Sequence, residues 1–233
     1  PAPYEGNTGN ITQDRDGIIR TDGTDTEVGL SANGTITLTG AIQSSGSANV
    51  VASDAIAVND IESGGGIYLD NFVLPFADAI IGSGDITING TLTAAAGGNA
   101  FIAYSAGGIT MAETSTVTGT GGDFSLYADT GDIMLGQLDA DGGDVTINAD
   151  QGWVSDNNEE ANNITANSLQ IEAFEGIGNN AATVDALETR VSTLAAETDT
   201  GNIQIANTGA LIIGEITSTM LPVNITTTGA VIN

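Results

Sequence analysis

One hexapeptide in the middle of the chain has the carboxylates best spaced to hold a metal ion. It reads Asp139-Ala140-Asp141-Gly142-Gly143-Asp144, with acidic side chains before, within and after a tight glycine turn. Carboxylate oxygens that converge around such a turn are calcium ligands, although the closing glutamate of an EF-hand loop is missing here. The other interpretation is an acidic turn between two structural repeats. We expect no required cofactor, and calcium as the ion that this turn could bind.

Four aspartates near the N-terminus form a second candidate cluster: Asp14, Asp16, Asp22 and Asp25. The same two interpretations apply to them, a cation site or acidic turns. The glycine- and aspartate-rich nonapeptide of calcium-binding secreted solenoids is not reproduced anywhere in the chain. We therefore do not expect a regular row of calcium sites.

The residue types that the chain lacks exclude most catalytic mechanisms. It contains no histidine and no cysteine, and its three basic residues are Arg15, Arg20 and Arg190. This composition excludes cysteine nucleophiles, serine–histidine–aspartate triads, lysine Schiff bases and thiolate zinc sites. A polysaccharide hydrolase that works with two carboxylates is the enzymatic alternative left open. Because most carboxylates sit in turns, we expect a protein that is not an enzyme.

The charge of the chain limits its partners. Its 30 acidic residues against three basic ones give a formal net charge of -27. Nucleic acids and anionic membranes both require a basic patch, which three arginines cannot form. No segment has the roughly 18 uninterrupted apolar residues of a membrane-spanning helix. We expect neither nucleic-acid binding nor membrane insertion, and a surface that requires salt or divalent cations.

A short sequence motif that recurs along the chain, here called the phrase, predicts the fold. A glycine, usually a polar residue, and then alternating apolar and polar positions recur in Gly84-Asp85-Ile86-Thr87-Ile88, Gly122-Asp123-Phe124-Ser125-Leu126 and Gly143-Asp144-Val145-Thr146-Ile147. Two-residue alternation bounded by glycine indicates short strands with one buried face, and the recurrence indicates stacked repeats. With one coil per roughly 20 to 24 residues, the phrase predicts an all-β solenoid of about ten coils.

Several segments do not follow this repeat pattern. Residues 1–30 are predicted to form an irregular acidic cap or linker, and residues 31–233 the solenoid rod. Residues 155–163 have the composition of an exposed loop that extends one coil. Residues 183–198 place apolar side chains at helical spacing, so a helix and continued strands are both open there.

Two further features concern the surface and the end of the chain. The end, Ala230-Val231-Ile232-Asn233, stops inside an apparent strand, which indicates stacking on a neighbour or on further coils. Chance and turn chemistry account for most of the Asn-x-Thr glycosylation sequons. These begin at Asn10, Asn33, Asn89, Asn163 and Asn224.

Three segments in the second half of the chain form a distinctive pattern. They are the run from Glu175-Gly176-Ile177-Gly178-Asn179-Asn180 through Thr183-Val184-Asp185-Ala186-Leu187, then Leu194-Ala195-Ala196, and then Gly201-Asn202-Ile203-Gln204-Ile205. This pattern resembles large bacterial surface proteins of the filamentous-haemagglutinin-like type. The Gly-Asp-Ile-x-Leu coils are also similar, which extends the resemblance over roughly residues 34–233. It implies a right-handed parallel β-helix, exported by two-partner or autotransporter secretion, that acts in adhesion or matrix building.

These observations favour a secreted structural or adhesive β-solenoid that forms a stiff acidic rod at the cell surface or in an extracellular fibre. Its expected partners are copies of itself or neighbouring solenoid coils, and also surface glycans or other cells. A filament or surface-layer subunit that stacks end to end is the first alternative. A polysaccharide-acting β-helix enzyme is the second.

Overall fold

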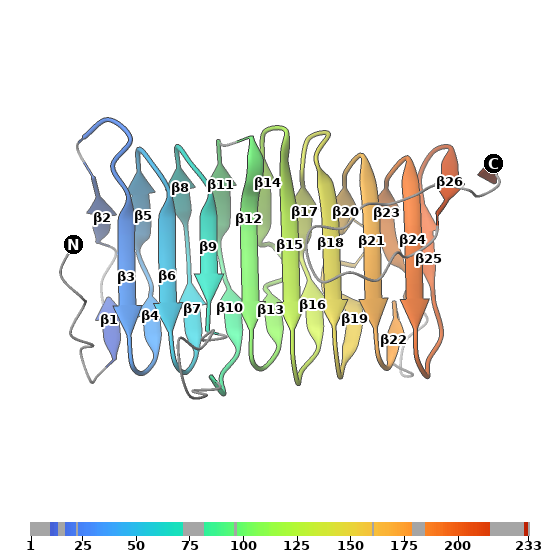
Figure 1. The fold of residues 1–233 in the computed structure, drawn as a ribbon, viewed down its shortest axis with the longest axis horizontal. Helices are drawn as coiled ribbons and strands as arrows, with labels where there is room; N and C mark the ends of the chain where they lie inside the picture. The colour runs from blue at the N-terminus through green and yellow to red at the C-terminus, as the bar shows by residue number, and fades with distance from the viewer. Residues whose placement is uncertain are drawn as a thin grey trace.

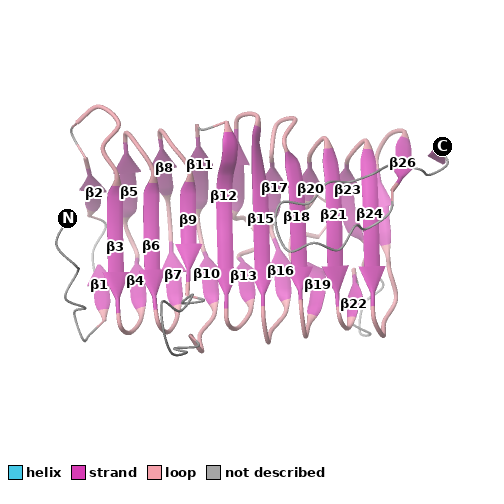
Figure 2. Ribbon diagram, viewed as in Figure 1, coloured by secondary structure: helices cyan, strands magenta, loops and turns pink. Residues whose placement is uncertain are grey.

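The computed structural model describes residues 10–13, 17–21, 23–71, 82–95, 97–159, 161–178, 185–214 and 231–232. Every regular element in these ranges is a β-strand (Figure 2). No helix that could cross a membrane occurs among them. The strands stand side by side in one elongated stack (Figure 1). The predicted all-β class is confirmed.

Three sheets run along the stack. Sheet A contains β1 (Ile11–Gln13), β4 (Ile36–Leu38), β7 (Ile56–Val58), β10 (Ile86–Ile88), β13 (Ile109–Met111), β16 (Ile133–Leu135), β19 (Trp153–Asp156) and β22 (Gly176–Ile177). Sheet B contains β2 (Ile18–Arg20), β5 (Ala41–Ser44), β8 (Ile61–Ser63), β11 (Thr91–Ala94), β14 (Thr116–Gly119), β17 (Gln137–Asp139), β20 (Ile164–Thr165), β23 (Leu187–Arg190) and β25 (Ile205–Asn207).

Sheet C has the longest strands and faces the viewer in Figure 1. It contains β3 (Val28–Ala32), β6 (Ala48–Ala52), β9 (Ile67–Asp70), β12 (Gly98–Ser105), β15 (Gly122–Ala128), β18 (Asp144–Ala149), β21 (Ser168–Ala173), β24 (Thr193–Thr198), β26 (Leu211–Ile213) and β27 (Val231–Ile232). Neighbouring strands are parallel, except that β27 pairs antiparallel with β26. Parallel pairing from β1 to β26 is what winding of the chain in one direction produces.

Each coil contributes one strand to sheet A, one to sheet B and one to sheet C. Strands β1 to β24 form eight complete coils, which β25 and β26 continue. The predicted parallel β-solenoid is therefore confirmed, but its count of about ten coils is too high. The estimate assumed one coil length, whereas the step between stacked residues varies: Ile36 pairs with Ile56, and Ile56 pairs with Ile86.

The core consists of apolar rows that run along the stack. In sheet A, Ile36, Ile56, Ile86, Ile109 and Ile133 occupy successive register positions, and all are fully buried. Strict alternation sends every second side chain inward, so each coil adds one residue to each row. Burial of these side chains, stacked at about 4.8 Å intervals, supplies the main stabilisation of the stack.

Threonines occupy outward positions on sheet B. Thr91 pairs with Thr116 and Thr93 with Thr118. The Thr118 hydroxyl donates to the Thr93 hydroxyl over 3.3 Å. A β-branched side chain fits the pleat, and its hydroxyl remains in contact with water.

Close approach between coils explains the glycine at Gly201. A Cβ built there would overlap the carbonyl oxygen of Glu175 in the coil below. Glycine is required at such a position because the two backbones come too close for any side chain.

The segments that the sequence left open are largely described. Residues 187–190 and 193–198 form β23 and β24, so strands and not a helix continue through this region. The segment 1–30 contains β1 and β2, which pair with β4 and β5 of the second coil. Residues 157–163 connect β19 to β20, although Asn158 and Asn163 within this connection are buried. The prediction of an exposed loop is wrong for these two residues, because their side chains bond the backbone of the coil below.

Candidate functional site

The acidic hexapeptide forms the turn between β17 and β18. The amide of Asp141 donates to the Asp139 carboxylate over 3.1 Å, and Asp141 and Gly142 both have positive φ, at 39° and 88°. The Asp144 carboxylate accepts hydrogen bonds from Asn167, over 3.1 Å, and from Ser168 in the next coil. Its own amide donates to Asp123 of the previous coil over 2.9 Å. Asp139 and Asp144 thus accept hydrogen bonds that stabilise the conformations of turns.

The structure does not bring the carboxylates of Asp139, Asp141 and Asp144 together within 4.8 Å. Asp25, from the N-terminal cluster, lies exposed in the turn between β2 and β3 with φ at 53°. The other members of that cluster, Asp14, Asp16 and Asp22, lie outside the described residues.

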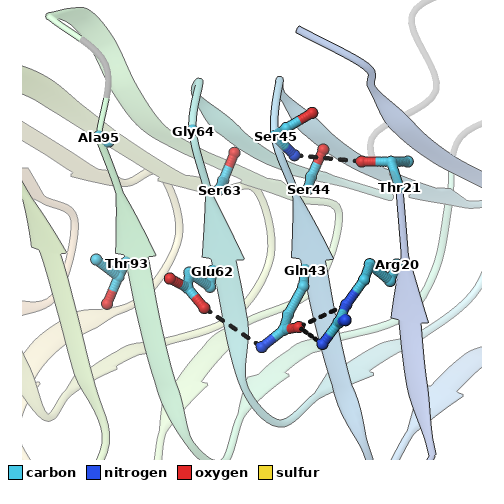
Figure 3. Close-up of a pocket in the computed structure, with 10 residues that line it drawn as sticks. All are labelled: Arg20, Thr21, Gln43, Ser44, Ser45, Glu62, Ser63, Gly64, Thr93 and Ala95. Atoms are coloured by element: carbon cyan, nitrogen blue, oxygen red, sulfur yellow. Dashed lines mark hydrogen bonds between the residues drawn. The ribbon is translucent and has the colours of Figure 1, made fainter. Parts of the chain in front are cut away.

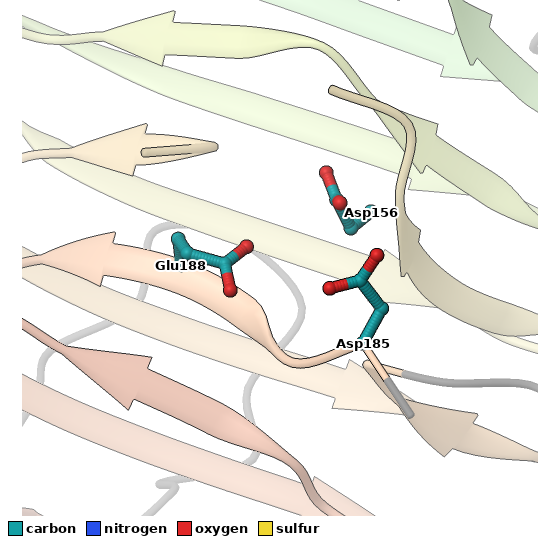
Figure 4. Close-up of side chains that lie close together, drawn as sticks. All are labelled: Asp156, Asp185 and Glu188. Carbon is teal, nitrogen blue, oxygen red and sulfur yellow. The ribbon is translucent and has the colours of Figure 1, made fainter. Parts of the chain in front are cut away.

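A different set of carboxylates does converge. Asp156, Asp185 and Glu188, here called the acidic trio, each place a carboxylate oxygen within 4.8 Å of the others (Figure 4). Asp156 ends β19, Asp185 lies just before β23, and Glu188 lies within β23. The trio therefore joins two neighbouring coils. Carboxylate oxygens this close repel one another, and a hard cation such as calcium relieves the repulsion.

Buried asparagines hold two members of the trio in place. The Asp156 carboxylate accepts from the Asn158 amide over 2.8 Å and from the Asn163 side chain. The Asn163 side-chain oxygen accepts from the Glu188 amide over 2.9 Å. Asn163 is fully buried, and Asn158 is 7% exposed with a side-chain oxygen that has no hydrogen-bond partner. The connection between β19 and β20 therefore contributes Asn158 and Asn163 to a buried network of hydrogen bonds.

Sequence reasoning missed this network. Asn163 was noted as the start of a sequon, but full burial removes it as a glycan acceptor in the folded chain. Asn71 plays a comparable part elsewhere: its amide group donates to Asp54 and Gly84 carbonyls over 2.8 and 2.7 Å, while its oxygen accepts from Ala106. The sequence does not predict which asparagines are buried, because residue type alone does not distinguish a buried asparagine from an exposed one.

A shallow pocket of about 360 Å³, lined mainly by residues with polar side chains, lies on sheet B near the first coils (Figure 3). Arg20 donates to the Gln43 side-chain oxygen over 3.0 and 2.6 Å, and Gln43 donates to Glu62 over 3.4 Å. Glu62 is the single carboxylate in its lining. A hydrolase of the two-carboxylate type needs a pair, so the pocket does not have the groups for that chemistry.

Comparison with protein-family models, with curated proteins and with solved structures gives no match. The class of protein that the fold defines is the parallel β-solenoid.

Proposed function

We propose that the chain is a secreted structural or adhesive β-solenoid, which forms a stiff acidic rod at the cell surface or in an extracellular fibre. The observation that carries the proposal is the continuous stack of three parallel sheets from the first coil to β26. In such a stack each coil contacts only its neighbours, so added coils add length and stiffness. Repetition fills nearly the whole described chain.

The resemblance to filamentous-haemagglutinin-like proteins supports the extracellular setting. Those proteins are built from similar glycine-led coils, and the resemblance is the basis for proposing export, adhesion and a right-handed winding. The absence of cysteine fits this proposal, because stacked coils are stable without disulfides. The high negative charge keeps separate rods apart.

Calcium is the ion we propose for the acidic trio. Calcium takes six to eight oxygen ligands in flexible geometry, and its sites combine carboxylates with amide oxygens. The trio offers three carboxylates, in a network that also contains the unpartnered amide oxygen of Asn158. A bound cation would join the seventh coil to the eighth and strengthen the rod along its axis.

End-to-end assembly is the alternative that a specific observation favours. Ile203, beyond the eighth coil, continues the inward row that contains buried Ile177 and is 45% exposed. This apolar side chain would be covered if a second copy stacked on this end of the described coils. A polysaccharide-acting enzyme is the less favoured alternative, because no described observation supports paired catalytic carboxylates beside a groove.

Single-molecule pulling between the chain ends tests the structural role. A load-bearing stack should unfold in discrete steps, each releasing one coil of about 20 to 30 residues, or roughly 65 to 110 Å of contour length. A single smooth extension at low force would contradict the proposal. Negative-stain electron microscopy of the same sample decides the alternative, since fibres favour head-to-tail stacking and persistent single particles exclude it.

A further inference from the structure

An aromatic strip lies on the outward face of sheet C. Tyr68, Tyr104 and Tyr127 come from β9, β12 and β15, which lie side by side in the middle of the stack (Figure 1). The chain has four tyrosines, so three of them share one face. All three are half-buried, while their strand neighbours Phe101 and Phe124 point into the core.

Tyr104 and Tyr127 form a corner on this face. They are direct partners in the parallel register, with ring centroids 6.4 Å apart and ring planes at 82°. In this edge-to-face contact the two half-buried rings lie side by side on the outward face with different orientations. Arrangements of this kind bind organic cations, because the ring faces carry partial negative charge.

Two carboxylates flank the corner, one in the coil below Tyr104 and one two residues after Tyr127 in the same coil. Asp70 is the register partner of Tyr104 in the coil below, and the Tyr127 hydroxyl donates to Asp129 over 3.4 Å. Burial and Asp70 raise the pKa of Tyr104. Burial, Asp150 and Asp129 raise the pKa of Tyr127 to about 12. Both phenols therefore stay neutral at physiological pH, within a negative local potential.

No basic side chain of sheet C balances this potential. The strands of the sheet contain no arginine, and the two arginines in described strands, Arg20 and Arg190, both belong to sheet B. The row that contains Tyr104 and Tyr127 continues through Asn148 to Glu172 and Glu197 in register. The face thus combines an aromatic corner with further negative charge along the same line.

We propose that the corner of Tyr104 and Tyr127, flanked by Asp70 and Asp129, is a docking site for lysine side chains of a basic partner polypeptide. The ammonium group would lie between ring faces and carboxylates, while the four-carbon stem packs on the half-buried rings. An amino sugar has no such stem, which favours lysine. The inference rests on the proposed adhesive role, for which it names a partner.

Binding of a fluorescently labelled octalysine peptide at 0.15 M salt tests the site. Replacing both rings, Tyr104→Leu with Tyr127→Leu, should weaken binding about 5- to 30-fold, because each cation–π contact is removed while apolar bulk is retained. The ring-preserving pair Tyr104→Phe with Tyr127→Phe should bind within about twofold of wild type. Far-UV circular dichroism and melting curves confirm that each variant folds.

The matched charge control separates this site from general attraction to an acidic surface. Asp70→Asn with Asp129→Asn should weaken binding more than Asp139→Asn with Asp141→Asn, which removes equal charge from another turn. Equal losses in the two pairs, or unchanged binding in the leucine pair, would overturn the proposal. Tighter binding of a chitosan oligomer than of octalysine would replace the polypeptide with an amino-sugar polymer. Step-wise unfolding under force is unaffected by any of these results, so the structural role is judged separately.

Discussion

Asn163→Ala is the substitution that most sharply tests how the coils are held together. The Asn163 amide group donates to the carbonyls of Leu135 and Gly136 over 3.1 and 3.3 Å and to the Asp156 carboxylate. Its oxygen accepts from the Glu188 amide in the next coil. One side chain therefore links three successive coils, from β16 through β20 to β23.

The cost of the substitution follows from the hydrogen bonds that it removes. Leu135 O still accepts from the Asn157 amide, and Gly136 O from the Asn158 side chain. The bond from the Glu188 amide to the Asn163 side chain is lost, and removing one partner of such a bond costs about 1 to 3 kcal/mol. With the lost bond to Asp156 and the void left by the side chain, we expect a total of about 2 to 4 kcal/mol. This corresponds to roughly a 30- to 700-fold change in the unfolding equilibrium.

Urea denaturation followed by tryptophan fluorescence measures this loss. Trp153 is the single tryptophan and lies in β19, in the same coil as Asn163, so its signal reports unfolding of the relevant region. Asn89→Ala is the matched control, because Asn89 also begins a sequon but has an exposed side chain. We expect the control to change the unfolding free energy by less than about 0.5 kcal/mol. Equal losses of unfolding free energy in the two variants would refute the role of Asn163 as a buried hydrogen-bonding link between coils.

Three further outcomes are expected. Gly201→Ala should lower the melting temperature clearly, since its Cβ would overlap the neighbouring backbone, whereas Gly29→Ala, with nothing within 4 Å of the added Cβ, should not. Folding raises the pKa of Tyr127 from 10.0 to about 12, so the contribution of this phenol to folding stability is complete below pH 10 and is lost as pH rises through about 12. Absorbance titration should show a phenol that titrates near pH 12, and Tyr127→Phe should remove it. Calcium should raise the melting temperature more than magnesium at equal concentration, and Glu188→Gln should reduce this shift while Asp139→Asn leaves it unchanged.

Each of these expectations has a contradicting result. Equal melting temperatures for the two glycine variants would remove close approach as the reason for the glycine. Titration of all tyrosines together near pH 10 would contradict the environment assigned to Tyr127. Equal shifts with calcium and magnesium, or a calcium shift that survives loss of the glutamate carboxylate, would exclude the acidic trio as a specific site.

The repeated phrase was sufficient to predict strands, because alternation and glycine act locally. Ile86, Ile109 and Ile133 follow the phrase, and each occupies the expected buried position in sheet A. The number of coils was harder to predict, because the number of residues per coil varies. A longer coil, such as the one from Ile56 to its register partner Ile86, leaves the phrase unchanged but reduces the count.

The acidic trio shows what local patterns cannot reveal. Asp139 and Asp144 stand close in the sequence, yet turn geometry directs Asp144 toward Asn167 and Asp123 in neighbouring coils. Asp156 and Glu188 stand far apart in the sequence, but the register between coils brings their carboxylates together. Predicting such a site requires the length of every intervening turn, which composition does not supply.

Immunogold electron microscopy of intact source cells, with an antibody raised against the purified chain, tests the central claim most directly. The account predicts gold particles on the outer surface or along extracellular fibres. Labelling must disappear when the antibody is first absorbed with purified protein. Gold that appears only inside sectioned cells, with none on their surface or on external fibres, would contradict an extracellular structural role.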